Sequence, residues 1–504
     1  MAGKLEVERK YEVPADFTLP PLAGVGGVAS VGDADDLRLD ATYYDTPTLR
    51  LARGRVTLRR RTGGHDAGWH LKRPAGGDRS ELQVPATSSR QTKPPAAVTA
   101  QVRALSRGEA LQPVARIRTH RIERALRAAD GSTVALVAED SVNTESLHGS
   151  RPERQWRELE IELVDGSRSA LDDLDAALRA AGARPAASPS KLAQALGDDY
   201  PAAPPSPTKP SPLAVYVRDQ RDAIIEHDPG ARDGEVESVH KMRVATRRLR
   251  STIRSFAPLL PAVTDSGWAL DRLHDEIKWL TGILGEVRDG DVMGERLTTA
   301  VAAEPPELVL GPVAARVEQF LAGRTAAARE RLIAGLDSER YTGLLVELDA
   351  FVDAAAGQVA RKQLMRLAHR ALRRADRRLA AAEHTPPDAP ALPGHATRDE
   401  RMHEARKAYK RARYAAELVA PIAGAKATKL ADRLTDLQDV LGAHQDSIVT
   451  GELLRELAVQ AYAAGENAFT YGLLHARQHE HGLLVLNDLP KVRRRAAKAA
   501  RKLY

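Results

Sequence analysis

Residues 4–13 read KLEVERKYEV, a run in which apolar and charged side chains alternate. Side chains two residues apart on a β-strand point to the same side, so Glu6, Glu8 and Lys10 share one face. The apolar side chains between them share the opposite face. The run therefore predicts a strand whose polar face carries two carboxylates and an ammonium group.

Four further runs before residue 200 show the same alternation. The residues that share a charged face are Arg59 and Arg61, His70 and Lys72, Arg116 and Arg118, and Glu158, Glu160 and Glu162. For one strand alone, a sheet with a solvated face is the simpler interpretation. Five such strands favour a closed barrel, with the charged faces toward a polar lumen and helices over the apolar outside. Carboxylates beside Arg and Lys in a lumen would suit divalent cations and phosphates bound side by side.

Composition narrows the functional classes. The chain has 504 residues, a formal net charge of +7 and no cysteine, and 4% of its residues are aromatic. The positive charge points to a polyanionic partner, but few aromatic side chains are present to stack on bases, which argues against nucleic acid. Any metal must have oxygen or imidazole ligands. No apolar run long enough for a bilayer or a signal peptide occurs, which predicts a cytoplasmic protein without membrane association.

The run YPAAPPSPTKPSP over residues 200–212 predicts an extended linker between two domains, 1–199 and 213–504. Beyond it, the apolar residues recur with a helical period and strand-like alternation is almost absent. HKMRVATRRLR at 240–250 matches HEARKAYKRAR at 403–413, and ILGEVRDGD from Ile283 matches VLGAHQDS from Val440. We therefore expect a multidomain α+β protein, with an N-terminal antiparallel barrel and an all-α domain that contains two copies of one helical unit.

Three of the predicted helices carry a basic stripe. The stripes are His240, Arg243, Arg247, Arg250 and Arg254; Lys362, Arg366, His369, Arg373 and Arg377; and His403, Arg406, Lys410 and Arg413. A solvated face is the usual explanation for one such stripe. Several stripes would repel one another unless an anion lay between them, so their recurrence favours an anion-binding surface.

The N-terminal motifs E-x-E-x-K, YYDTPTLRLARGRVTLRRRTGG, GWHLKRP and RELEIEL resemble the CYTH family of triphosphate tunnel enzymes over residues 3–197. The resemblance implies an eight-stranded tunnel in which carboxylates hold Mg²⁺ or Mn²⁺, cations hold the phosphates and water is the nucleophile. It implies catalytic roles for Glu6, Glu8 and Lys10. The implied metal ligands are Glu6, Glu8, Asp140, Glu158, Glu160 and Glu162, and the implied substrate contacts are Arg59, Arg61, Lys72, Arg116, Arg118 and Lys191.

The helical half resembles the CHAD domain over residues 213–504, through HKMRVATRRLR, WLTGILGEVRDGDV and LQDVLGAHQDS. That resemblance implies two four-helix units around a basic surface that binds inorganic polyphosphate. The three stripes would then contact phosphates, and Asp289 and Asp446 would brace neighbouring cations rather than bind metal.

Together these observations predict a metal-dependent hydrolase of inorganic triphosphate or related linear triphosphates, whose helical domain binds polyphosphate and associates with polyphosphate granules. One alternative is a non-catalytic polyphosphate-binding or granule-targeting protein, but it would gain nothing from carboxylates that face phosphates. A nucleotide cyclase that acts on ATP is a second alternative, and the sequence contains no evident adenine pocket.

Overall fold

The computed structural model describes residues 4–75, 78–88, 91–149, 152–202, 211–263, 267–355, 357, 359–386 and 396–504, without the side chains of 4–6, 75 and 78. The chain divides into two compact units, Met1–Ser206 and Pro207–Tyr504. Most of the predicted linker, residues 203–210, lies outside the described residues. Among the described helices, none is long and apolar enough to cross a membrane.

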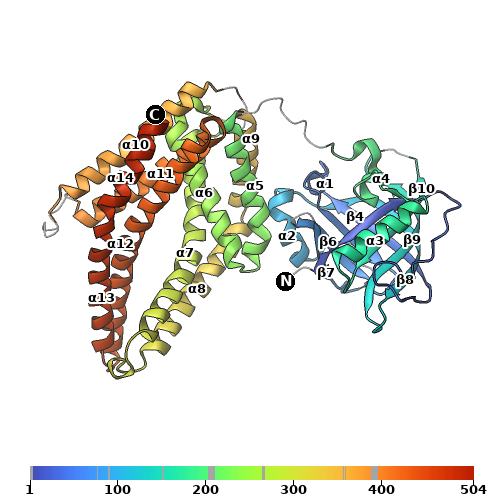
Figure 1. Cartoon of the computed structure of the whole chain (residues 1–504), viewed down its shortest axis with the longest axis horizontal. Coiled ribbons are helices and arrows are strands. Elements are labelled where there is room, and N and C mark those ends of the chain that lie inside the picture. Colours follow the sequence, from blue (N-terminus) through green and yellow to red (C-terminus); the bar gives the residue numbers. More distant parts are fainter. Residues whose placement is uncertain are drawn as a thin grey trace. The chain divides into compact units, whose positions relative to one another are not determined.

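The first unit is an antiparallel β-structure with covering helices, as the sequence predicts (Figure 1). Its strands are β1 (Lys4–Glu6), β2 (Glu8–Glu12), β3 (Ser30–Val31), β4 (Asp35–Asp45), β5 (Thr57–Thr62), β6 (Gly68–Ala75), β7 (Asp78–Val84), β8 (Gln112–Arg127), β9 (Thr133–Ser146), β10 (Arg154–Leu163) and β11 (Arg184–Pro185). Its helices are α1 (Arg50–Arg53), α2 (Ala96–Ser106), α3 (Arg168–Ala180) and α4 (Lys191–Leu196), followed by the 3₁₀ turn η1 (Gly197–Asp199).

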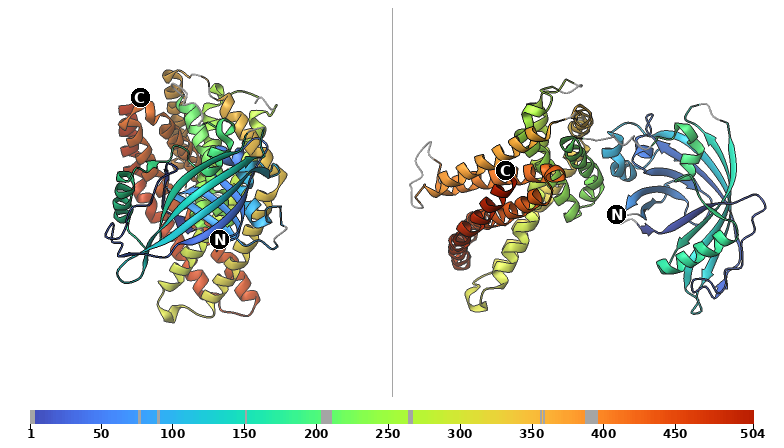
Figure 2. Two further views of the ribbon diagram at one scale, coloured as in Figure 1. Left: turned by 90° about the vertical axis from the view of Figure 1, so that its right-hand side faces the viewer. Right: turned by 45° about the horizontal axis from the view of Figure 1, so that its top comes forward.

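The strands pair in the order β1-β7-β6-β5-β4-β8-β9-β10-β2-β11, and β3 pairs with β8. Only Val7 separates β1 from β2, so the first run of the chain pairs with β7 at its beginning and with β10 at its end. This continuous run joins the two ends of the sheet and closes it into a barrel, whose curved strands are visible in Figure 2.

Alternation along the strands decides which side chains enter the barrel. On β10, Leu159 and Ile161 are fully buried in a cluster with Leu174 of α3, which covers the outside. The helix α2 covers a second outer cluster around Trp69 and Leu71 of β6. The residues between these apolar positions therefore face the lumen, which is how the sheet acquires a charged interior.

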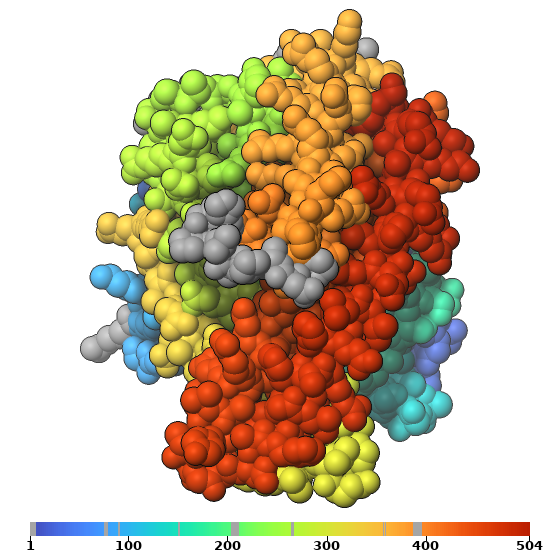
Figure 3. Space-filling view, turned by 90° about the vertical axis from the view of Figure 1, so that its left-hand side faces the viewer, coloured from blue at the N-terminus to red at the C-terminus, as the bar shows by residue number. Residues whose placement is uncertain are grey.

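The second unit consists of helices. They are α5 (Pro212–Arg232), α6 (Val236–Phe256), α7 (Leu270–Ala302), α8 (Val313–Asp337), α9 (Glu339–Ala354), α10 (Arg361–Glu383), α11 (Arg398–Ala423), α12 (Ala425–Ala463), α13 (Phe469–Val485) and α14 (Leu489–Leu503), with the 3₁₀ turns η2 (Ala257–Leu259), η3 (Pro306–Leu308) and η4 (Leu486–Asp488). Consecutive helices pack together from α5 to α8 and from α10 to α13, and α11 also packs on α5 and α6. Figure 3 shows the face on which the C-terminal helices, coloured orange to red, come together.

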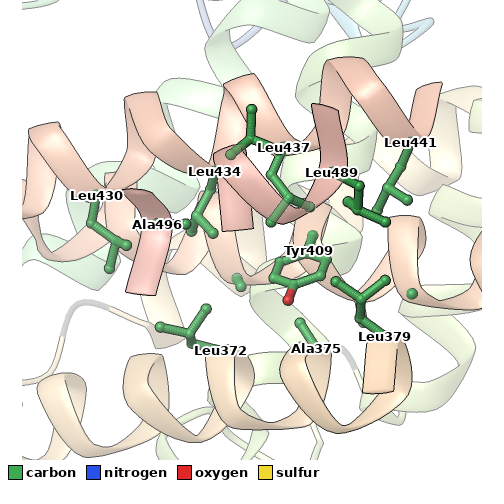
Figure 4. Close-up of a cluster of buried hydrophobic side chains, with 14 of the residues drawn as sticks. Leu372, Ala375, Leu379, Tyr409, Leu430, Leu434, Leu437, Leu441, Leu489 and Ala496 are labelled. Carbon is green, nitrogen blue, oxygen red and sulfur yellow. The ribbon is translucent and has the colours of Figure 1, made fainter. Parts of the chain in front are cut away.

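Apolar stripes on these helices build the core. A cluster between α10, α11, α12 and α14 contains Leu379, Tyr409, Leu434 and Leu489, and all four side chains are buried (Figure 4). The Tyr409 hydroxyl donates a hydrogen bond of 2.7 Å to a carboxylate oxygen of Asp376, so the one polar atom of this ring has a partner. This packing fixes α11, which carries one of the predicted basic stripes.

Candidate functional site

A cavity of 440 Å³ lies inside the barrel, and strands from all sides of the barrel contribute charged side chains to it. The predicted site residues that line the cavity are Glu8, Lys10, Arg59, Arg61, Lys72, Glu160, Glu162 and Lys191. Glu6 lies on β1, opposite Arg79 of β7, but its side chain is outside the described residues. The structure thus brings most of the predicted residues of the first unit together.

Three carboxylates form an acidic group at this site, of which Glu160 lines the cavity and the other two lie buried beside it. Asp140 of β9 and Glu158 of β10 are directly opposite in the register of the two strands. With Glu160 they form a group whose ligand oxygens lie within 4.8 Å of one another, and such a group could bind a metal ion. Asp140 and Glu158 are buried, so their charges need compensation.

Lys191 supplies part of that compensation. It begins α4, whose Ser190 cap accepts a hydrogen bond of 3.1 Å from the backbone N–H of Ala193. The Lys191 Nζ lies 2.9 Å from Asp140 Oδ2 and 2.8 Å from Glu160 Oε1, and it also pairs with Glu158. Burial would lower the pKa of Lys191, but these carboxylates hold that pKa well above its ordinary value. The ammonium is therefore charged and occupies the middle of the acidic group.

Lys10 and Arg121 complete the ion network. The Lys10 Nζ lies 2.7 Å from Glu160 Oε1 and 3.4 Å from Glu8 Oε1. Arg121 donates from Nη2 to Glu160 at 2.6 Å and from Nε to Asp140 at 2.8 Å. Burial would raise the pKa of Glu160, but Lys10, Lys191 and Arg121 outweigh it and hold the pKa well below the usual range.

The basic side of the cavity is crowded with like charges. Burial and the nearby guanidinium groups of Arg59 and Arg121 lower the pKa of Arg61 to about 10. The Nε atoms of Arg59 and Arg61 are buried and have no hydrogen-bond partner. Arg61 pairs with Asp66, and among the described residues Arg59 donates its one hydrogen bond to the Tyr43 hydroxyl, at 3.4 Å. An anion with several oxygens would relieve both the repulsion and the missing hydrogen bonds.

The structure does not bring Arg116 and Arg118 into the cavity. Both lie on the outer face of β8, where Arg116 Nε donates to Asp40 Oδ1 at 3.0 Å, and their side chains are 43% and 49% exposed. Ile117 and Thr119 line the cavity instead, so the prediction chose the wrong face of this strand. On β8 none of the described helices covers the outer face at Arg116 and Arg118, and the more densely charged face of the strand is this outer one.

Sequence reasoning missed several charged residues of the cavity. Arg121 and Glu123 follow Thr119 on the inner face of β8, and Arg79 and Glu81 come from β7. The opposite phase of β8, which runs from Ile117 through Thr119, leads to the first two. The carboxylate of Glu81 lies 2.8 Å from His70 Nδ1, and burial lowers the pKa of this histidine.

In the second unit, α6 and α11 bring two predicted stripes together. Arg243 and Arg247 of α6 lie close enough to Arg406 and Lys410 of α11 for their charges to repel. Burial and the neighbouring guanidinium groups, Arg247 and Arg406 foremost, lower the pKa of Lys410 to about 6. We call these four residues, with Arg413, the central cluster.

The two copies of the helical unit build equivalent halves of this cluster. A Cβ atom on Gly285 would lie 3.5 Å from Arg243 Nε, and one on Gly442 would lie 3.5 Å from Arg406 Nε. The Arg243 Nη1 atom is 3.0 Å from Asp289 Oδ1, and Asp446 faces Arg406. Asp289 therefore braces an arginine of the cluster in one copy, whereas in the other copy Asp446 attracts Arg406 but pairs with Arg296, at 3.0 Å.

The predicted histidines lie beside the central cluster. His240 and His403 are half-buried, and burial is the main cause that lowers the pKa of both. His403 Nδ1 lies 2.8 Å from Gln445 Oε1. Both imidazoles are therefore neutral at pH 7.

The third predicted stripe does not join the cluster. Lys362, Arg366 and Arg373 are exposed on α10, and His369 stacks on Tyr504 at 4.3 Å between ring centroids. The neighbouring stripe of the same helix, Arg374 and Arg378, approaches Arg411 of α11 instead. The predicted stripe of α10 is thus one continuous face that lies opposite the buried face of the helix and away from the central cluster.

Comparisons with known proteins agree with this architecture. The family model of the CYTH domain matches residues 4–193, and that of the CHAD domain matches residues 215–455. Two proteins of Mycobacterium tuberculosis, uncharacterized protein MT2285 of strain CDC 1551 and uncharacterized protein Rv2226 of strain H37Rv, are 37% identical to this chain over 517 residues, with 99% of this chain and 98% of each relative covered.

Two solved structures are also similar. PptA from Streptomyces chartreusis is 22% identical, with a TM-score of 0.46 over 57% of this chain and 100% of its own. The CHAD domain from the plant Ricinus communis is 27% identical, with a TM-score of 0.40 over 56% of this chain and 88% of its own. From the domain matches and the full-length relatives, the chain belongs to the family of proteins in which a CYTH domain is followed by a CHAD domain.

Proposed function

We propose that the barrel hydrolyses inorganic triphosphate or a related linear triphosphate with the help of a divalent metal, and that the helical unit binds inorganic polyphosphate. The observation that carries the first part is a single cavity in which mutually repelling, partly unpartnered guanidinium groups face a cluster of carboxylates. CYTH domains are metal-dependent, and the family includes triphosphatases and cyclases.

The basic side of the cavity would bind the phosphates. Arg59 and Arg61 have buried Nε atoms without acceptors, and a guanidinium group can donate to two phosphate oxygens at once. Lys72 lines the same cavity from β6. These groups would hold a linear phosphate chain in place and stabilise the charge that develops when a phosphoanhydride bond breaks.

The acidic side would hold the metal. Carboxylate oxygens are the donors that Mg²⁺ and Mn²⁺ prefer, so Asp140, Glu158 and Glu160 fit such an ion in chemistry and spacing. A bound divalent ion neutralises phosphate charge and lowers the pKa of a coordinated water. The ammonium of Lys191 pairs with the same three carboxylates, so these side chains can bind a metal together only if Lys191 moves aside.

The central cluster supports the proposal for the helical unit. Five basic side chains from α6 and α11 are held together, and burial together with the neighbouring guanidinium groups lowers the pKa of Lys410 to about 6. A polyanion between the two helices would turn this repulsion into attraction. The same chemistry would attach the protein to polyphosphate granules.

The test is phosphate release by the purified full chain with Mg²⁺ or Mn²⁺, from triphosphate, long-chain polyphosphate, ATP and thiamine triphosphate. We expect release from triphosphate by the wild type and its loss in Glu8→Gln and Glu160→Gln variants. A chain that binds polyphosphate but releases phosphate from no substrate would be the non-catalytic alternative. Formation of cyclic AMP from ATP without release of inorganic phosphate would indicate a cyclase.

A further inference from the structure

Among the positions at which the two copies of the helical unit differ, one equivalent pair exchanges an arginine for a glutamate beside the central cluster. The match between residues 240–250 and 403–413 has an offset of 163, so Arg248 corresponds to Arg411 and, four positions beyond the match, Arg254 corresponds to Glu417. One side of the central cluster therefore has an arginine that faces a glutamate, and the equivalent side has two arginines.

The side with the glutamate is electrostatically satisfied. The Arg248 Nη2 atom lies 3.0 Å from Glu417 Oε2, and the Tyr216 hydroxyl donates to the same carboxylate at 3.2 Å. Arg413 also pairs with Glu417, at 3.7 Å. One carboxylate on this side thus pairs both with Arg248, which borders the central cluster, and with Arg413, which belongs to it.

The equivalent side accumulates positive charge. Burial, and then Arg378, Arg374 and Arg254, lower the pKa of Arg411 to about 10. The nearest carboxylate from α11, Glu404, pairs with Arg378 at 2.8 Å and also with Lys407.

At the α6 end of this side, Asp275 attracts Arg250 without forming an ion pair with it. Arg254 donates to His274 Nε2 at 3.1 Å, and Asp275 of α7 lies beside that histidine. The Arg250 Nε atom is buried without a hydrogen-bond partner. Across the described parts of the chain, Arg250, Arg254, Arg374 and Arg411 form no ion pair.

We infer that Arg250, Arg254, Arg374, Arg378 and Arg411, which we call the flanking cluster, form a second phosphate site, so that a polyphosphate chain leaves the central cluster on this side only. The inference rests on the proposed function of the helical unit. Arg243, Arg247, Arg250 and Arg254 follow one face of α6, with a rise of about 16 Å from the first to the last. A long polyphosphate can reach along the whole of that face, whereas a triphosphate is too short to span it.

Binding of long-chain polyphosphate to the full chain tests this assignment. Arg374→Gln with Arg378→Gln removes two charges from the flanking cluster, and Arg373→Gln with Arg377→Gln removes two exposed charges from the same helix as a matched control. We expect the first variant to bind roughly tenfold more weakly at moderate salt, with a smaller salt dependence, and the control to change affinity less than about twofold.

A third variant, Arg254→Glu, would give this side the arginine–glutamate pair that the chain already contains at Arg248 and Glu417. Because the equivalent pair is part of the folded protein, we expect the variant to fold, with a thermal midpoint near that of the wild type, and to bind polyphosphate at least as weakly as the Arg374/Arg378 variant. Equal affinities of the Arg374/Arg378 variant and its control would overturn the inference, as would undiminished binding by Arg254→Glu.

Failure of the proposed function gives a different result. Arg243→Gln with Arg406→Gln weakens the central cluster itself. If the wild type binds no polyphosphate, or if this variant binds as well as the wild type, the proposal for the helical unit is wrong. If this variant is impaired while the flanking variants are not, the central cluster binds polyphosphate and only the second site is refuted.

Discussion

Lys410 gives the sharpest test of the electrostatics of the helical unit. Its amine is half-buried in the central cluster, and burial together with Arg247, Arg406, Arg243 and Arg413 lowers its pKa from 10.5 to about 6. At a pH below this lowered pKa, Lys410 of the folded protein is protonated and adds a positive charge to the cluster. Above that pKa, the lysine is neutral in the folded state but still protonated in the unfolded state.

The sign and size of the effect follow from this difference. Because the unfolded state binds the extra proton between pH 6 and 10.5, the free energy of unfolding rises with pH across that window. From pH 7 to the ordinary pKa of 10.5 there are about 3.5 pH units, and each is worth about 1.4 kcal/mol. Lys410 therefore destabilises the folded protein by at most about 5 kcal/mol at pH 7, and solvent screening reduces this value.

Replacement of Lys410 by Met should remove this penalty. We expect Lys410→Met to raise the free energy of unfolding of the helical unit by a few kcal/mol at pH 7, and the gain to shrink toward zero near pH 10. Urea unfolding followed by helical circular dichroism at several pH values measures the gain. Lys362→Met makes the same replacement at an exposed lysine of α10 and should change little.

The reasoning would be refuted if Lys410→Met lowered stability at pH 7 or if its effect did not vary with pH. The same variant should bind polyphosphate more weakly than the wild type, because a bound anion raises the pKa of the amine and recruits its charge. Where like charges are packed together to bind an anion, removal of one of them is expected to stabilise the free protein and to weaken binding of the anion.

Two further predictions concern the barrel. Lys191→Met removes the ammonium that pairs with Asp140, Glu158 and Glu160, so without metal it should lower the free energy of unfolding of the barrel by about 3 kcal/mol or more, and Mg²⁺ should restore more stability to the variant than it adds to the wild type. Thermal unfolding with and without Mg²⁺ measures both effects, and a loss that Mg²⁺ cannot reverse would contradict the assignment of a metal to these carboxylates. Arg59→Gln with Arg61→Gln should lower triphosphate hydrolysis by about 100-fold or more, whereas Arg116→Gln with Arg118→Gln, on the outer face, should keep most of the rate. Steady-state rates of the two double variants decide the point, and similar losses in both would mean that the outer arginines also contact substrate.

Much of the barrel could be predicted because its strands alternate with a period of two. On β10 the apolar residues are buried beneath α3, so the carboxylates between them must face the lumen. The same argument applies to Arg59 and Arg61 of β5, since Leu58 lies in the cluster beneath α2. Burial of one face by a helix makes the alternation unambiguous.

The strand β8 shows where this argument ends. Its outer face bears Arg116 and Arg118, which pair with Asp40 of the neighbouring β4. Charged pairs between strands stabilise a solvated face as well as a lumen does. When both faces of a strand carry polar residues, its sequence does not show which face lies inside the barrel. The inner face is then decided by the register of the strand with its neighbours.

The helical unit shows a second limit of prediction from sequence. The period of a helix shows which residues share a face, but not which other helix that face contacts. The basic stripes of α6 and α11 meet because the two helices occupy equivalent places in the two copies and pack on each other. The stripe of α10 that begins at Lys362 is opposite its buried face, which contains Leu364, Leu372 and Leu379, and so it meets solvent. Arg378 flanks that buried face and can therefore reach the next helix.

Duplication also explains why the two sides of the central cluster can differ. Arg243 and Arg406 lie where the two helices cross, and each faces its equivalent in the other copy. A replacement of either residue therefore alters a contact that the two copies share. Arg254 and Glu417 lie farther along the helices, and each faces a different residue, Arg411 or Arg248. A single replacement at such a position changes one side only. A duplicated fold can thus keep a symmetric centre for phosphate while one flank gains positive charge and the other is neutralised.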